Sequence, residues 1–166
     1  MGKNLRLLLN INVLDTIQDS TDAKHFHLFP FQRIALRASM RYRYHFETAT
    51  RATAKSFTAY LSAVVRAVLL PRSTIMIASD TKGTVIKIAE AKFEEIFRHW
   101  PLLRKELATR KDDGKTGEKH SSNYYELYIK NGSMISVVAK DSSRGLRATA
   151  AILEEAALIN NCELAA

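Results

Sequence analysis

The fold expected of this chain is decided by Ala49-Thr50-Arg51-Ala52-Thr53-Ala54-Lys55-Ser56. This stretch has the spacing G-x-x-x-x-G-K-[ST] of a phosphate-binding loop, with alanine at both glycine positions. It lies between residues 41–47, which alternate like a strand, and residues 57–70, which are apolar like a buried helix. Backbone N–H groups at the start of that helix would hold phosphates, Lys55 would neutralise them and Ser56 would hold Mg²⁺. The alternative interpretation is an alanine-rich helix start.

The segments around the loop alternate between helix and strand periods. Helices are expected at 30–40, 57–70 and 84–98, and a charged, solvated loop is expected at 104–120. Strands are expected at 41–47, 74–78, 124–130, 133–139 and 148–153, with Asn131-Gly132 as the turn of a hairpin. This order predicts an α/β fold with a mostly parallel sheet flanked by helices.

Composition sets the class of protein. The chain has 166 residues, 46% of them hydrophobic, which permits one globular domain at 28–166 after an N-terminal helix and linker at 1–27. Its single cysteine, Cys162, excludes an intrachain disulfide and favours a reducing compartment. No apolar run is long enough to span a bilayer, so no membrane partner is expected. The net charge of +8 suits a polyanion such as nucleic acid without identifying it.

Two glutamates, Glu154 and Glu155, follow the last apolar strand about a hundred residues after Lys55. Phosphoryl transfer needs one carboxylate to orient Mg²⁺ and a second to polarise the attacking water. We therefore assign Glu154 to magnesium and Glu155 to the water. Taken alone, two glutamates also suit the first turn of a helix, where negative charge is favourable.

Two further side chains suit a nucleotide. Gln32, which follows aromatic residues at 29 and 31, has an amide that can pair with both the donor and the acceptor of adenine. Arg51 lies inside the loop, where its cation would reach the γ-phosphate as an arginine finger supplied in cis. A plain helix start and an exposed arginine are the alternatives.

These elements, in this order, resemble the large terminase subunit of tailed bacteriophages, over residues 28–160. Arg144-Gly145-Leu146-Arg147 running into Glu154-Glu155 is the most specific part of the resemblance. The family implies a P-loop NTPase of the ASCE type, with adenine contact for Gln32 and a cis-acting role for Arg51. It implies that Thr53, Ala54, Lys55 and Ser56 bind ATP, that Ser56 and Glu154 bind Mg²⁺, and that Glu155 is the catalytic carboxylate.

The resemblance also implies a function. The expected activity is ATP hydrolysis that drives viral DNA into the procapsid, in the host cytoplasm, with double-stranded DNA, portal protein and the small terminase subunit as partners of a homo-oligomeric ring. The family usually has glycine at position 54 and aspartate at 154, and it continues into further strands and a nuclease domain. The chain therefore looks like the front part of a terminase, cut short after the strand of the acidic pair. A helicase-type ATPase and a non-catalytic basic DNA-binding or assembly fragment are the alternatives.

Overall fold

The computed structural model describes residues 27–50, 53–79, 84–109, 117–120, 124–139 and 147–154. The expected helix within 1–27, the loop residue Arg51 and the acidic Glu155 lie outside these residues. The elements that the described residues form are α3 (Pro30–Arg41), α4 (Lys55–Leu69), β1 (Thr74–Ser79), α5 (Thr84–His99), α6 (Pro101–Lys105), β2 (Glu118–His120), β3 (Tyr124–Tyr128), β4 (Met134–Ala139) and β5 (Ala150–Leu153).

The five strands form one open sheet in the order β2-β3-β4-β1-β5. β1 lies between β4 and β5 and is parallel to both, while β3 is antiparallel to β2 and β4. The sheet is therefore mixed, and the expectation of a mostly parallel sheet is wrong. The hairpin explains the difference, because a tight turn joins only antiparallel strands.

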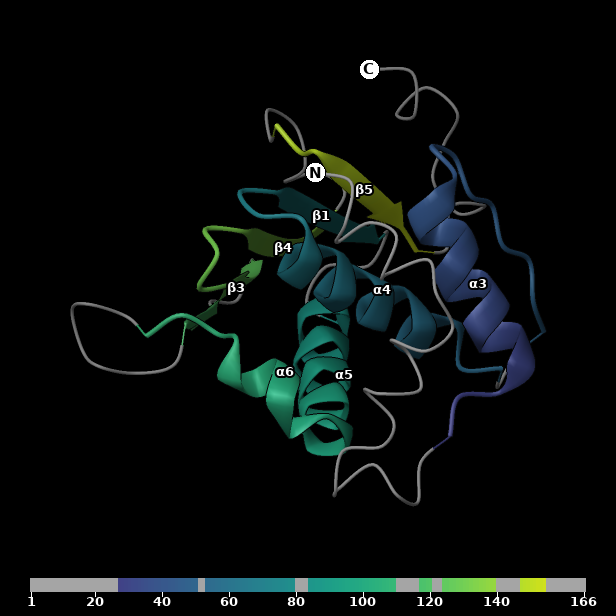
Figure 1. The fold of residues 1–166 in the computed structure, drawn as a ribbon, viewed down its shortest axis with the longest axis horizontal. Coiled ribbons are helices and arrows are strands. Elements are labelled where there is room, and N and C mark those ends of the chain that lie inside the picture. Colours follow the sequence, from purple (N-terminus) through teal and green to yellow (C-terminus); the bar gives the residue numbers. More distant parts are fainter. Residues whose placement is uncertain are drawn as a thin grey trace.

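Helices α4 and α5 supply most of the core that covers the sheet (Figure 1). α4 is apolar nearly all round and contacts α3, α5, β1 and β4, which is why so much of it is buried. An aromatic cluster joins the layers: Phe93 of α5 packs edge-on against Tyr60 of α4 at 5.1 Å and stacks on Tyr125 of β3 at 5.5 Å between ring centroids. The buried core therefore includes side chains of both helices and of the sheet.

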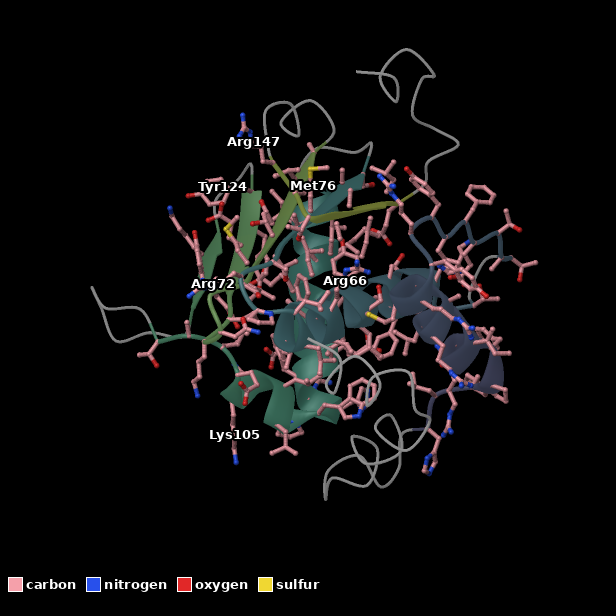
Figure 2. The ribbon with its side chains drawn as sticks, turned by 45° about the horizontal axis from the view of Figure 1, so that its top comes forward. Arg66, Arg72, Met76, Lys105, Tyr124 and Arg147 are labelled. Atoms are coloured by element: carbon pink, nitrogen blue, oxygen red, sulfur yellow. The ribbon has the colours of Figure 1, made fainter. Side chains whose placement is uncertain are left out.

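Helix α3 packs on α4. A guanidinium N–H of Arg66 in α4 donates to the Ser39 carbonyl of α3 at 3.1 Å, and Figure 2 shows Arg66 close to the helices. Lys105 and Arg147, by contrast, are exposed and project away from the body of the protein (Figure 2). The partly buried guanidinium of Arg66 is thus hydrogen-bonded to the neighbouring helix.

Most expected elements are confirmed to within a few residues, namely the helices at 30–40, 57–70 and 84–98 and the strands at 74–78, 124–130, 133–139 and 148–153. The hairpin turn is also confirmed: Gly132 has φ 84°, and its N–H donates to the Ile129 carbonyl at 3.0 Å. A positive φ there is the conformation that favours glycine at this turn.

The strand expected at 41–47 is wrong. α3 continues to Arg41, and the residues after it join no strand of the sheet. Tyr44 and Phe46 are each 82% exposed, so the alternating aromatic side chains cover no core. Alternation predicts a strand only where a neighbouring strand pairs with it, and none of the described strands does.

The solvated loop expected at 104–120 is partly wrong. α6 extends to Lys105, Leu107 forms a bridge with Ile129, and β2 begins at Glu118. A Cβ at Gly117 would lie 2.7 Å from the Ala108 carbonyl oxygen, so only glycine lets the chain approach the sheet there. The many charged residues of this stretch suggested a loop, whereas its last residues form β2, an antiparallel strand at the edge of the sheet.

The amino ends of β1, β4 and β5 are joined by polar side chains. Buried Ser133 donates its hydroxyl to the Leu70 carbonyl at 2.8 Å and accepts the Ser73 N–H at 3.1 Å. The amide nitrogen of Asn131 donates to the carbonyls of Ala67 and Val68, both at 2.8 Å, at the end of α4. Polar groups at this edge of the sheet are therefore well satisfied.

Candidate nucleotide site

The sequence-predicted loop and the first glutamate lie at the same edge of the sheet. α4 leads through a short turn into β1 and covers the sheet, so α4 begins near the edge at which β1 and β5 end. Figure 1 shows the start of α4, the arrowhead of β5 and α3 on the same side of the molecule. Ligands of α/β proteins bind at the carboxyl ends of parallel strands, so this edge is where a site is expected.

Ala54 begins α4 in the left-handed conformation, with φ 55° and ψ 33°. Alanine is strained there by about 1 kcal/mol relative to glycine, because its Cβ approaches the following carbonyl oxygen. Position 54 is where the phosphate-binding spacing has its second glycine. The backbone of this chain therefore adopts a conformation that favours glycine at that position, although the residue is alanine.

The Lys55 ammonium is hydrogen-bonded to backbone carbonyls that precede α4. Its Nζ donates to the Ala49 carbonyl at 2.6 Å and to the Thr50 carbonyl at 3.4 Å. The Thr53 hydroxyl donates to the same Thr50 carbonyl at 2.8 Å. Lys55 is nonetheless exposed, so the ammonium lies at the surface beside the start of α4, where an anion would be attracted to both.

A cavity of about 460 Å³ opens between α3 and the loop. Its apolar side comes from Phe31, Ile34, Ala35 and Ala38 of α3, and its other side from residues 45, 47–50 and 53. A volume of this size holds a small organic molecule. The cavity lies directly beside the loop that contacts Lys55, because Ala49, Thr50 and Thr53 belong to both.

Gln32 is buried, whereas the aromatic residues shortly before it, Phe29 and Phe31, are exposed. Its side chain is 3% exposed, and its Oε1 accepts the Phe29 backbone N–H at 2.9 Å, which caps the start of α3. It is not among the residues that line the cavity, whereas Phe31 is. In this arrangement the carbonyl oxygen of Gln32 has a partner within α3, and only its amide N–H groups remain for a base.

Glu154 is held at the carboxyl end of β5. Its backbone N–H donates to the Ala78 carbonyl at 2.9 Å, one residue beyond the last pair of β1 and β5. Tyr60, whose pKa the charge of Glu154 affects, comes from the buried side of α4. Burial raises the pKa of Tyr60 far above its ordinary value, and the negative charge of Glu154 raises this pKa further.

Of the residues predicted for the site, the structure places Thr53, Ala54, Lys55 and Ser56 at the start of α4, Glu154 at the end of β5, and Gln32 inside the start of α3. Within the described ranges, no three His, Cys, Asp or Glu side chains cluster as a metal site. One carboxylate and one hydroxyl still fit Mg²⁺, because this ion keeps several waters and takes few protein ligands. The sequence analysis did not single out Tyr60, because its hydroxyl is one of several along this helix, beside those of Thr58 and Ser62.

A scan against protein-family models finds none that matches this chain, and a search of curated proteins finds no match either. No helix in the described residues is both long and apolar enough to cross a membrane.

Proposed function

We propose that this chain is the N-terminal ATPase part of a phage terminase large subunit, which binds and hydrolyses ATP to drive viral DNA into the procapsid. The observation that carries the proposal is the loop before α4. Ala54 takes the left-handed conformation at the position that is glycine in the spacing of a phosphate-binding loop, and the Lys55 ammonium donates to the carbonyls of Ala49 and Thr50. Sequence spacing, backbone conformation and a neighbouring cavity thus agree at one place.

The proposal gives each predicted site residue a role. Lys55 would exchange its carbonyl partners for the phosphates of ATP, whose charge it neutralises better. Ser56 and Glu154 would hold Mg²⁺, which supplies charge neutralisation on the phosphates when bound. Glu155 would orient and polarise the attacking water, and Arg51 would stabilise the charge that develops on the γ-phosphate.

The cavity beside the loop suits the nucleoside. Phe31 is 47% exposed at its edge and stacks on Phe29 at 5.8 Å between ring centroids, which gives a base a flat apolar surface. Gln32 is buried and does not line this cavity, so a contact of its amide N–H groups with adenine would require its side chain to turn toward the cavity. This assignment keeps the base near α3 and the phosphates at the start of α4.

A second candidate function, a basic DNA-binding fragment, is favoured by one surface. The exposed segment after α3 pairs each of two arginines with the next aromatic ring: Cζ of Arg41 lies 5.9 Å from the centroid of Tyr42, and Cζ of Arg43 lies 5.4 Å from that of Tyr44. Arginine and exposed aromatic rings together suit the phosphates and bases of nucleic acid. In a packaging motor, the same surface would face the DNA.

Calorimetric titration with ATP and Mg²⁺ tests the proposal. We expect Lys55→Ala to weaken binding by about 10- to 100-fold, the effect of losing one charge-assisted contact of roughly 1.5–3 kcal/mol. Lys130→Ala removes an exposed lysine from the hairpin turn and serves as the matched control, with affinity unchanged.

The result also separates the two candidates. A folded wild-type chain that binds no Mg·ATP contradicts the ATPase proposal. Binding of double-stranded DNA that survives Lys55→Ala, without any ATP binding, supports the DNA-binding fragment instead.

A further inference from the structure

The segment that follows α3 divides its side chains between two directions. His45 and Glu47 line the cavity beside the loop. Tyr44 and Phe46 do not line it, and each of them is 82% exposed. Tyr42, at the end of α3, is 58% exposed. Three aromatic rings therefore lie in water within five residues, outside the candidate nucleotide site, and exposed aromatic side chains gathered in one place are typical of a binding surface.

The same part of the chain is strongly basic. Residues 27–46 contain four arginines and no aspartate or glutamate. Arg37 and Arg41 are exposed on α3, four residues apart and so on the same side of the helix, and Arg43 is exposed two residues after α3 ends. Among the described residues, no carboxylate forms an ion pair with any of these three arginines. Because their charge is not offset nearby, this surface attracts an anionic partner.

Arginine and aromatic side chains are paired along this surface. Cζ of Arg41 lies 5.9 Å from the centroid of the Tyr42 ring. Cζ of Arg43 lies 5.4 Å from the centroid of the Tyr44 ring. A guanidinium held over an aromatic ring keeps its N–H groups available to the oxygens of a phosphate. Each pair therefore presents a phosphate-binding group beside an exposed ring.

We infer that residues 41–46 bind a single-stranded nucleic acid, with its phosphates on the arginines and its bases stacked on the exposed rings. In a duplex, each base is already stacked on its neighbours and only its edges face the grooves, so the face of the Phe46 ring finds no base to stack on. The unpaired bases of a single strand offer their faces to such a ring, whatever their sequence. The inference does not rest on the proposed function, because these rings lie outside the cavity assigned to the nucleoside.

The molecule offers matched control positions away from this surface. Figure 1 shows α3 and α6 on opposite sides of the molecule, with α4 and α5 between them. Leu102 of α6 is 56% exposed, and Lys105 of α6 is exposed as well. Substituting either one removes exposed apolar area or a positive charge without changing the surface at residues 41–46.

Fluorescence anisotropy of the whole chain with a labelled oligothymidylate, without ATP, tests the rings. Tyr44→Ala and Phe46→Ala should each weaken binding by about 5- to 150-fold, the effect of losing one stacked base, whereas Leu102→Ala should leave it unchanged. Phe46→Trp should keep the affinity, and Phe46→Leu should lose as much as Phe46→Ala, because leucine is apolar but has no flat face. All these positions are exposed, so the variants keep the fold, which circular dichroism checks.

The arginines are tested by the salt dependence of the same binding. Arg43→Ala should reduce the slope of log affinity against log salt concentration by about 0.7, the value for one phosphate contact with a single strand. Lys105→Ala should leave the slope unchanged, since its charge lies on the opposite side of the molecule.

Two competitors separate stacking from charge. A DNA duplex of the same length, and inorganic polyphosphate of the same total charge, should each displace the labelled strand less well than unlabelled oligothymidylate does. A wild-type chain that binds no oligothymidylate, or that binds the duplex or polyphosphate at least as tightly, overturns the inference. An effect of Arg43→Ala with none from Tyr44→Ala or Phe46→Ala overturns it too, because charge alone would then hold the strand. No ATP is present in these measurements, so their failure is distinct from a failure to bind Mg·ATP.

Discussion

The two edges of the sheet at which the parallel strands begin and end are built differently. At the amino edge, Ser133, Ser73 and Asn131 form a connected set of hydrogen bonds that reaches the last carbonyls of α4. At the carboxyl edge, the Tyr60 hydroxyl is buried without a partner in the described residues, and Ala54 begins α4 in a strained conformation. The polar side chains at the amino edge are therefore hydrogen-bonded to one another. The carboxyl edge, by contrast, keeps a hydroxyl without a partner among the described residues and a strained backbone.

This difference indicates where a function resides. Unpaired buried groups and left-handed non-glycine residues reduce stability, so they persist where another requirement maintains them. Arg72, in the turn before β1, also has a positive φ of 59°, which means that strain alone does not mark the carboxyl edge. The combination of strain, an unpaired hydroxyl and a neighbouring cavity does.

The largest effect on stability is expected at the amino edge. Ser133→Ala removes the group that serves the Leu70 carbonyl and the Ser73 N–H and should lower the free energy of unfolding by about 2–4 kcal/mol, because both partners are left buried and unpaired. Chemical denaturation measures this change. Affinity for Mg·ATP, measured where the variant is folded, should match that of the wild type.

Ser136→Ala is the control for Ser133→Ala. Ser136 is buried in β4, three residues after Ser133, and its side chain makes no hydrogen bond within the described part of the chain, so its loss should change the free energy of unfolding by less than about 0.5 kcal/mol. Equal effects of the two substitutions would contradict the contrast between the edges, since the hydrogen bonds of Ser133 would then contribute nothing.

A smaller effect, of opposite sign, is expected at the carboxyl edge. Ala54→Gly relieves the left-handed alanine and should raise the free energy of unfolding by up to about 1 kcal/mol, the relief of strain being partly offset by the greater entropy of glycine in the unfolded chain. The same change should tighten Mg·ATP binding, because the loop conformation around Lys55 becomes easier to reach.

Arg72→Gly is the control for Ala54→Gly, because it relieves the same kind of strain at the other edge. It should stabilise the protein comparably and leave nucleotide affinity unchanged. Loss of stability in Ala54→Gly would contradict the left-handed conformation at position 54.

Much of the fold was predictable from local sequence. Hydrophobic periodicity located α3, α4, α5 and the strands that pack beneath them, and Asn131-Gly132 located the hairpin, because these signals depend on neighbouring residues alone. Spacing also located the start of α4, down to Ala54 as the residue at the glycine position of the loop.

The remainder depends on partners distant in sequence. Alternation at 41–47 predicted a strand, yet whether Tyr44 and Phe46 are covered depends on a neighbouring strand that the pattern cannot specify. The charge of Glu154 raises the pKa of Tyr60 although the two residues are almost a hundred positions apart, so no spacing rule identifies this influence. Gln32 was assigned to adenine only because it is a glutamine next to aromatic residues. A glutamine at this position can equally accept the Phe29 N–H and cap the start of the helix, as it does in the structure.

The smallest predicted effect concerns pH at the helix that supports the site. His99 ends α5, and the next residue, Trp100, packs on Phe57 of α4 at 6.1 Å between ring centroids. Burial lowers the pKa of His99 below its ordinary 6.5, and the charge of Arg98 lowers it further, against the opposing effect of Glu95.

Because the folded protein binds this proton more weakly than the unfolded chain, stability should fall as the pH drops through 6.5 toward the lower pKa of the folded state. His99→Gln should remove that part of the pH dependence, by less than the effect of Ala54→Gly, whereas His45→Gln, at an exposed position, should not. Chemical unfolding of the three proteins between pH 5 and pH 7.5 makes the comparison. A wild-type protein that gains stability relative to His99→Gln as the pH falls would show that the charged imidazole is favoured at the end of α5, and that burial is the weaker influence there.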